Sequence, residues 1–321
     1  MTNQMKPILC RKTDNAGAVI LLFVCLIFLF RSSGSNVFAQ QETAPGKYRI
    51  EFTDKNNTPF STDRPEEFLS ERAIQRRIRQ EIPIDFKDIP VNQFYIDSIR
   101  NTGVEVLTVS KWFNAITVAC NDSTALKKIK NFSFVRKAEL KGCTSLSAQS
   151  EHKMNNAVNQ VEESTYFDYG YSARQINIHK GEKLHNLGYT GKNIHIAVID
   201  AGFYNVDALE AFTHLWQNGQ ILGTRDFVNR KSNIFQEHSH GKTVLSVIGG
   251  YIPGFLIGSA PDASFWLLRS EDVNSEYIIE EDNWIAAAEF ADSAGVDIIN
   301  TSLGYSVFDN TAQNHNYSDM D

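Results

Sequence analysis

The sequence has few cysteines and no excess of positive charge. Only four of its 321 residues are cysteine, and Cys10 and Cys25 fall within the first 40 residues. The other two, Cys120 and Cys143, could pair or stay free, and no Cys-x-x-Cys or Cys/His spacing typical of structural zinc occurs. Lysine and arginine number 31 against 38 aspartates and glutamates, a formal net charge of -7. Such a balance gives no reason to expect nucleic acid as a partner.

A hydrophobic run long enough to cross a membrane is also missing. The longest uncharged apolar stretch is residues 16–30, whereas a membrane span needs roughly 20 residues. Lys6, Arg11 and Lys12 precede it, and Ala39 supplies a small residue at the expected cleavage position. This pattern is typical of a secretory signal peptide at residues 1–39, with retention as a signal anchor as the alternative. We therefore expect a secreted or extracytoplasmic protein that meets the membrane only transiently.

Residues 40–140 predict a small α+β domain. Strands are expected at 47–52, 103–109, 112–118 and 132–138, with a turn at Ser110 and Lys111 between the middle two. Helices are expected from Pro65, after Pro90 and at 123–130. The first of these has glutamates in its first turn and arginines near its end, which suits the helix dipole. The segment contains no histidine, so no catalysis of its own is expected.

Residues 141–165 are polar and favour an exposed linker, a natural place for proteolytic cutting. Beyond the linker, residues 166–321 alternate apolar strands with helices. Strands are expected near 194–200, 220–228, 263–268 and 296–302, the last of them buried. Helices are expected from His240 and at 277–294. This alternation predicts a parallel α/β sheet with helices on both faces.

Three motifs stand in order in this region. They are V-I-D-A-G-F with Asp200, H-S-H-G-K-T-V-L-S with His240, and I-I-N-T-S-L-G-Y with Ser302, Leu303 and Gly304. The apolar run before Asp200 places that carboxylate at the carboxyl end of a strand, the edge where open α/β sheets carry their chemistry. A histidine at the start of the apolar helix can converge on the same edge, and Gly241 gives that helix start room for close packing.

Together the motifs resemble those of the subtilisin-like serine proteases of peptidase family S8, over residues 169–305. The resemblance implies a secreted serine endopeptidase with a subtilisin-like fold that acts on protein or peptide substrates. It implies that Asp200 and His240 belong to an Asp-His-Ser triad, and that Ser302, Leu303 and Gly304 pair with the extended substrate. Residues 40–140 would be a propeptide that assists folding and inhibits the enzyme, and residues 141–165 would contain the maturation site. No cofactor is required for this chemistry, and structural calcium could not be assigned to particular residues.

The sequence departs from the family pattern at three points. Ala201 replaces the usual Ser or Thr after the aspartate, and Lys242-Thr243 replaces the usual Thr-His after His-Gly. Either change could lower activity. No G-T-S or G-x-S-x-G follows Asp200, so the nucleophilic serine and the oxyanion asparagine are not in this chain. We interpret the peptidase part at 166–321 as incomplete and expect the chain as given to be inactive.

Other functions remain open from the sequence. His238 and His240 form His-x-His, and with Asp200 or Glu237 they could bind the metal of a hydrolase. A dinucleotide-binding domain is disfavoured, because no G-x-G-x-x-G is present. A non-catalytic binding or inhibitory fragment is the third alternative. The acidic groups at 271–272 and 280–282, and Asp207, could bind Ca²⁺ or basic side chains, but a solvated surface is favoured for them.

Overall fold

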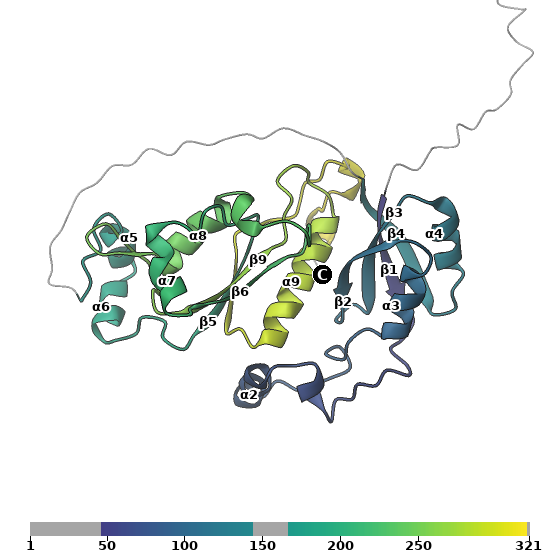
Figure 1. The fold of residues 1–321 in the computed structure, drawn as a ribbon, viewed down its shortest axis with the longest axis horizontal. Coiled ribbons are helices and arrows are strands. Elements are labelled where there is room, and N and C mark those ends of the chain that lie inside the picture. The colour runs from purple at the N-terminus through teal and green to yellow at the C-terminus, as the bar shows by residue number, and fades with distance from the viewer. Residues whose placement is uncertain (1–45, 144–165, 320–321) are drawn as a thin grey trace, which may run out of the picture. The chain divides into compact units, whose positions relative to one another are not determined.

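The computed structural model describes residues 46–143 and 166–319. The predicted signal peptide at 1–39 and most of the predicted linker lie outside these described residues. We call residues 46–143 the N-terminal module and residues 166–319 the C-terminal module (Figure 1). Neither described module contains a helix with the length and apolar character that a membrane span requires.

The N-terminal module is an antiparallel sheet with helices, which confirms the predicted α+β fold. Its strands are β1 (Gly46–Phe52), β2 (Glu105–Ser110), β3 (Ala115–Cys120) and β4 (Val135–Cys143), in the order β2-β3-β1-β4. Its helices are α2 (Glu71–Gln80), α3 (Gln93–Arg100) and α4 (Ser123–Lys130). Every second residue of β1 is buried, and Ile50 packs in one core with Ile99 of α3 and Ile129 of α4. The period-2 pattern of β1 thus gives this module its own apolar interior.

Two expectations for this module were wrong in detail. The helix expected from Pro65 is divided into a 3-10 turn at Pro65–Glu67 and the separate helix α2. The division falls at Ser70, whose hydroxyl accepts a hydrogen bond from the Ala73 N–H at 3.1 Å and so begins α2 as its N-cap. The β2–β3 turn occupies residues 111–114 rather than Ser110 and Lys111, because Asn114 takes a left-handed φ of 49° that ends the turn.

Cys120 of this module does not form a disulfide. Cys120 and Cys143 are both in register with Gly46, on opposite sides of β1. Neighbouring strands lie about 4.8 Å apart, so the two Cα atoms are roughly 10 Å apart, beyond the ~7 Å that a disulfide spans. Cys120 is a buried free thiol.

The C-terminal module contains the predicted parallel sheet. Its strands β5 (His195–Asp200), β6 (Ile221–Asp226), β9 (Ser264–Arg269) and β10 (Ile298–Thr301) lie in the order β10-β5-β9-β6. A short hairpin that the sequence pattern did not predict is formed by β7 (Tyr251–Ile252) and β8 (Leu256–Ile257). The helices are α5 (Ala173–Ile178), α6 (Gly181–Asn186), α7 (Thr213–Gln217), α8 (His240–Gly249) and α9 (Ile279–Ala294).

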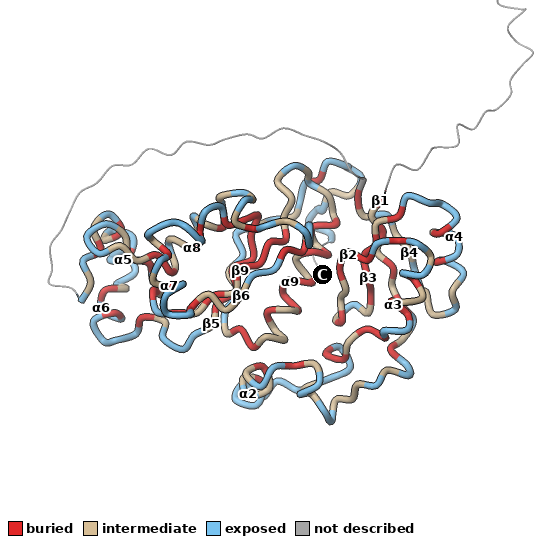
Figure 2. Tube along the Cα trace, viewed as in Figure 1, coloured by how far each residue is buried: buried red, intermediate tan, exposed pale blue. Residues whose placement is uncertain are grey.

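Helices cover both faces of this sheet, which confirms the predicted architecture. On one face, Ile196 and Val198 of β5 pack in a core with Leu245 of α8. On the other face, Ala197 and Ile199 pack against the alanines of α9. Figure 2 shows buried residues along β5, β9 and α9 between these layers. Both faces of β5 are covered, so side chains on both faces must be apolar, and this explains its near-continuous apolar run.

The prediction that the last strand is buried was wrong. Ile298 and Ile299 of β10 are 51% and 38% exposed. These side chains are exposed because β10 is an edge strand of the described sheet and pairs only with β5. An apolar sequence pattern cannot distinguish an edge strand from a central one.

Candidate functional site

Asp200 is the last residue of β5 and lies at the carboxyl edge of the parallel sheet. Its side chain is fully buried, with 0% exposed. Burial raises the pKa of the Asp200 carboxyl, because the low-dielectric interior disfavours the charged form. Hydrogen bonds from the His240 ring and from the Ala201 N–H oppose that rise. The carboxylate is thus a desolvated acceptor with two specific donors.

His240 is the first residue of α8, and its imidazole contacts this carboxylate. Its Nδ1 lies 2.8 Å from Asp200 Oδ1 and 3.0 Å from Oδ2. A carboxylate at this distance holds the tautomer that carries its proton on Nδ1. The His240 side chain is 45% exposed, and its Nε2 makes no hydrogen bond within the described residues. The outer nitrogen of the ring is therefore available to a further group.

Two glycines allow the end of β5 and the start of α8 to approach each other. A Cβ on Gly241 would lie 2.5 Å from the carbonyl oxygen of Gly202 and 2.9 Å from Cβ of Asp200. A Cβ on Gly202 would lie 2.5 Å from the backbone nitrogen of His238. Such contacts are too short for a real side chain, so the pairing of Asp200 with His240 depends on glycine at both positions.

A buried arginine at this edge was missed from the sequence. Arg269 ends β9, in register with Asp200 on one side and Asp226 on the other. It donates to the Ala201 carbonyl at 3.0 Å and pairs with Asp226 Oδ2 at 3.0 Å and with Glu237 at 3.4 Å. Arg269 thereby connects the ends of three strands to the loop before His240. The available signal was the repeated pattern of an apolar strand ending in a charged residue, which also describes Asp200.

Ser302, Leu303 and Gly304 follow β10 at the same edge. Thr301 of β10 is in register with Ile199, so the chain leaves the sheet one residue later, level with Asp200. Ser302 and Gly304 are exposed, and a Cβ on Gly304 would meet nothing within 4 Å. Within the described residues, the segment forms no hydrogen bond or ion pair with Asp200 or His240, although it lies at the same edge of the sheet.

The residues that departed from the family pattern have definite positions. Ala201 is buried, and its backbone N–H donates to Asp200 Oδ1 at 2.7 Å. Lys242 is half-buried on α8. His238 is exposed, and its Nδ1 accepts the His240 backbone N–H at 3.3 Å. No group of three or more His, Cys, Asp or Glu side chains arranged for a metal ion occurs within 46–143 and 166–319. The metal-hydrolase alternative therefore has no geometric support here.

The acidic residues of α9 are not the solvated surface that was favoured for them. Glu280 is 2% exposed, and neither of its carboxylate oxygens has a hydrogen-bond partner among the residues that the structure describes. Burial raises its pKa to about 9. Asp282 is also buried, and it pairs with Arg49 of the N-terminal module at 2.8 Å. Asp282 is buried where α9 contacts the N-terminal module, whereas the carboxylates that act on Glu280, those of Glu276 and Glu271, belong to the C-terminal module.

Comparison with known proteins finds relatives of this chain. A family model described as "Peptidase S8 propeptide domain, Bacteroidota" matches residues 47–160. Subtilisin E of Bacillus subtilis (strain 168) is 32% identical over 211 residues, which cover 65% of this chain and 46% of that protein. The subtilisin of Bacillus pumilus is 32% identical over 128 residues, covering 39% and 42% of the two chains. The chain is thus similar to subtilisin-like serine proteases of family S8, through the propeptide family model and through these subtilisin relatives.

The chain spans about half the length of these subtilisin relatives. Among solved structures, the epidermin leader peptide processing serine protease of Staphylococcus aureus (S393A mutant) matches with a TM-score of 0.43 and 12% identity, over 81% of this chain and 50% of that one. MycP1 of Mycobacterium smegmatis matches with a TM-score of 0.24 and 24% identity, over 39% of this chain and 30% of that one.

Proposed function

We propose that this chain comprises the signal peptide, the propeptide and the N-terminal part of the peptidase domain of a secreted subtilisin-like serine endopeptidase. The observation that supports this most strongly is the contact between buried Asp200 and His240 Nδ1, at 2.8 Å. Acyl transfer needs a carboxylate that is hydrogen-bonded to the Nδ1 of an imidazole, because the carboxylate orients the ring and stabilises the imidazolium that forms.

In this proposal His240 is the general base and Asp200 holds it. The exposed Nε2 takes the proton of a serine hydroxyl as that oxygen attacks the peptide carbonyl, and then returns the proton to the leaving amine. The serine and the oxyanion asparagine are not provided by these 321 residues. Ser302, Leu303 and Gly304 pair with the extended peptide through their backbone, and the exposure of Ser302 and Gly304 at the shared edge is compatible with that role.

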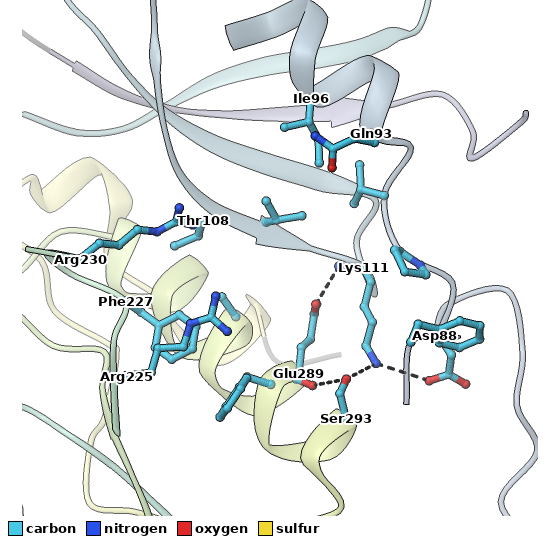
Figure 3. A pocket seen from close by; sticks show the side chains of 16 residues that line it. Asp88, Gln93, Ile96, Thr108, Lys111, Arg225, Phe227, Arg230, Glu289 and Ser293 are labelled. Carbon is cyan, nitrogen blue, oxygen red and sulfur yellow. Dashed lines mark hydrogen bonds and ion pairs between the residues drawn. The ribbon is translucent and has the colours of Figure 1, made fainter. Parts of the chain in front are cut away.

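The N-terminal module acts as the intramolecular inhibitor and folding assistant. Support comes from Glu289 of α9, whose carboxylate receives hydrogen bonds from the β2–β3 turn. The donors are the Ser110 hydroxyl at 2.6 Å, the Lys111 N–H at 2.7 Å and the Trp112 N–H at 3.1 Å. Figure 3 shows the hydrogen bond between Lys111 and Glu289, two of the residues that line one pocket. We place the maturation cut within residues 141–165.

The test is the loss of both activities on removal of the imidazole. In the longer polypeptide that includes the serine, His240→Ala is expected to lower casein hydrolysis by about 10⁴-fold or more and to abolish self-removal of residues 40–140. Hydrolysis is followed by release of labelled peptides, and maturation by the shift in mass. A His240→Ala protein that matured unaided and cleaved casein would exclude this role for His240.

The matched control is His179→Ala, because His179 is exposed and lies outside the site. This variant should keep activity within about threefold of wild type. The 321-residue chain alone should give no turnover. If the longer polypeptide were also inactive while still binding peptides, the alternative of a binding or inhibitory module would be favoured.

A further inference from the structure

The carboxyl end of α9 lacks a positive charge of its own. The helix is followed by Gly295 in the left-handed conformation, with φ of 81°. The last carbonyls of a helix have no partner within the helix and form the negative end of its dipole, where cations are stabilising. The last turn of α9 contains no basic residue and carries Asp292 instead. Left alone, this helix end would concentrate negative charge.

Helix α2 of the N-terminal module supplies the missing cations. Arg72 Nε donates to the carbonyl of Gly295 at 3.0 Å. Arg76 donates to the carbonyl of Val296 at 2.5 Å and pairs with the Asp292 carboxylate at 2.5 Å. These are charge-assisted bonds to the two carbonyls that directly follow α9, and Arg76 also donates to a carbonyl of its last turn, that of Asp292, at 3.5 Å. The arginines of α2 thus act as a C-terminal cap on α9.

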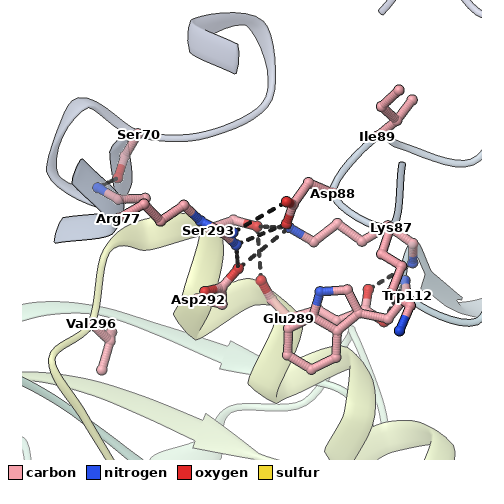
Figure 4. A network of polar contacts seen from close by, with 12 residues as sticks. Ser70, Arg77, Lys87, Asp88, Ile89, Trp112, Glu289, Asp292, Ser293 and Val296 are labelled. Atoms are coloured by element: carbon pink, nitrogen blue, oxygen red, sulfur yellow. Dashed lines mark hydrogen bonds and ion pairs between the residues drawn. The ribbon is translucent and has the colours of Figure 1, made fainter. Parts of the chain in front are cut away.

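Further charge pairs extend this contact. Arg72 also binds the Asp297 carboxylate just before β10. Arg77 lies between Asp88 of its own module, at 2.8 Å, and Asp292, at 2.6 Å. Figure 4 shows Arg77 reaching from α2 toward Asp88 and Asp292 in one network. Arg77 therefore joins the capping contact to the interior of the N-terminal module.

The backbones of α2 and α9 are also fitted to each other. A Cβ on Gly295 would lie 2.5 Å from the Ala73 nitrogen. The Ser70 N–H, at the start of α2, donates to the carbonyl of Ser293 at 2.9 Å. The contact is therefore a close approach of two helix ends rather than a loose pairing of long side chains.

This contact is separate from the one made by the β2–β3 turn. The turn binds Glu289 through its backbone, whereas α2 lies between β1 and α3 in the chain and contributes no strand to the sheet. We propose that α2 is a second anchor, whose arginines cap the carboxyl end of α9 and keep the N-terminal module bound after the linker between the modules is cut. Calling that cut a maturation step rests on the proposed function, but the binding itself does not.

The experiment uses the full 321-residue chain with a recognition site for a sequence-specific protease placed within residues 144–165. After complete cutting, the dissociation constant of the two fragments is measured by fluorescence anisotropy at 0.05 to 1 M NaCl. The wild-type fragments should remain associated at low salt. The double variant Arg72→Gln/Arg76→Gln should raise the dissociation constant by about 30-fold at low salt and flatten its salt dependence, because the ion pairs that salt screens are gone.

Arg79→Gln is the matched control on the same helix. Arg79 is 62% exposed and lies 4.0 Å from Asp297, so this variant should change the dissociation constant by less than about threefold. Circular dichroism of the uncut chain shows whether each variant folds. If the double variant failed to fold, Asp292→Asn, made on the other side of the contact, should weaken binding by about fivefold or more. Unchanged binding in a folded variant would overturn the second anchor.

Because no turnover is measured, the result is independent of the catalytic proposal. If the Arg72→Gln/Arg76→Gln variant lost binding and the longer polypeptide were inactive, the second anchor would be supported and the protease proposal rejected. If the variant bound as wild type does and the longer polypeptide showed activity that depends on His240, the protease proposal would be supported and the second anchor rejected.

Discussion

At Asp200, burial and hydrogen bonding act in opposite directions on one carboxylate. Burial raises its pKa, while the His240 ring and the Ala201 N–H both stabilise its charged form. The family pattern has a hydroxyl residue where this chain has Ala201, and here the backbone of Ala201 provides a donor at 2.7 Å. The carboxylate therefore keeps two donors despite the substitution.

Replacing this carboxylate by an amide should disable the imidazole without disturbing the fold. In the longer polypeptide, Asp200→Asn is expected to lower kcat by about 10⁴-fold, because the amide favours the wrong tautomer of His240. KM should change little, since Asp200 is buried away from substrate. Steady-state kinetics on a peptide substrate measures both constants. Asp168→Asn, at an exposed position outside the site, should leave kcat within about threefold.

The position of the first turn of α8 depends on one small residue, Gly241. Gly241→Ala would place a Cβ 2.5 Å from the Gly202 carbonyl and 2.9 Å from Phe203. We expect this overpacking to lower the free energy of unfolding by about 2 kcal/mol. Urea denaturation of the 321-residue chain measures the change. Gly304→Ala is the control, since nothing lies within 4 Å of its added Cβ. A Gly241→Ala protein as stable as wild type would contradict the close approach.

The elements also show what the sequence could predict. The positions of Asp200 and His240 were predictable because each follows from a local pattern, an apolar strand that ends in a charge and an apolar helix that begins with a histidine. The exposure of β10 was not predictable, because burial depends on which strands lie beside it. Arg269 was missed because a charge at the end of a strand normally reaches solvent, and here it meets Asp226 and Glu237 instead. The contact of α2 with α9 depends on residues more than 200 positions apart.

Taken over both modules, several buried carboxyls hold their protons more tightly in the folded chain. Burial raises the pKa of Asp282 and of Glu289, and it raises that of Glu271 to about 7. A raised pKa means that the folded state binds more protons than the unfolded state at neutral pH. Stability from these groups is therefore greatest in mild acid and falls as pH rises.

Glu280 should contribute most to this dependence. Its pKa is about 9 when folded, against an ordinary value of 4.5. Between these values, unfolding releases its proton, so stability should fall by up to about 1.4 kcal/mol per pH unit. Glu280→Gln cannot titrate, and we expect it to flatten the dependence and to be more stable than wild type at pH 8. Urea midpoints at pH 5, 6.5 and 8 measure this, with exposed Glu210→Gln as the control. Parallel pH profiles for wild type and Glu280→Gln would count against the assignment.

Helix α9 contacts both modules. Its alanines pack against the parallel sheet, and Asp282, Glu289 and Asp292 contact the N-terminal module. Departure of that module would therefore expose a strip of carboxylates on α9, beside the apolar cluster against which Trp112 packs. Such a strip hydrates readily and repels its counterpart on another copy. The carboxylates that hold the two modules together would therefore reduce aggregation of the C-terminal module after the N-terminal module has dissociated.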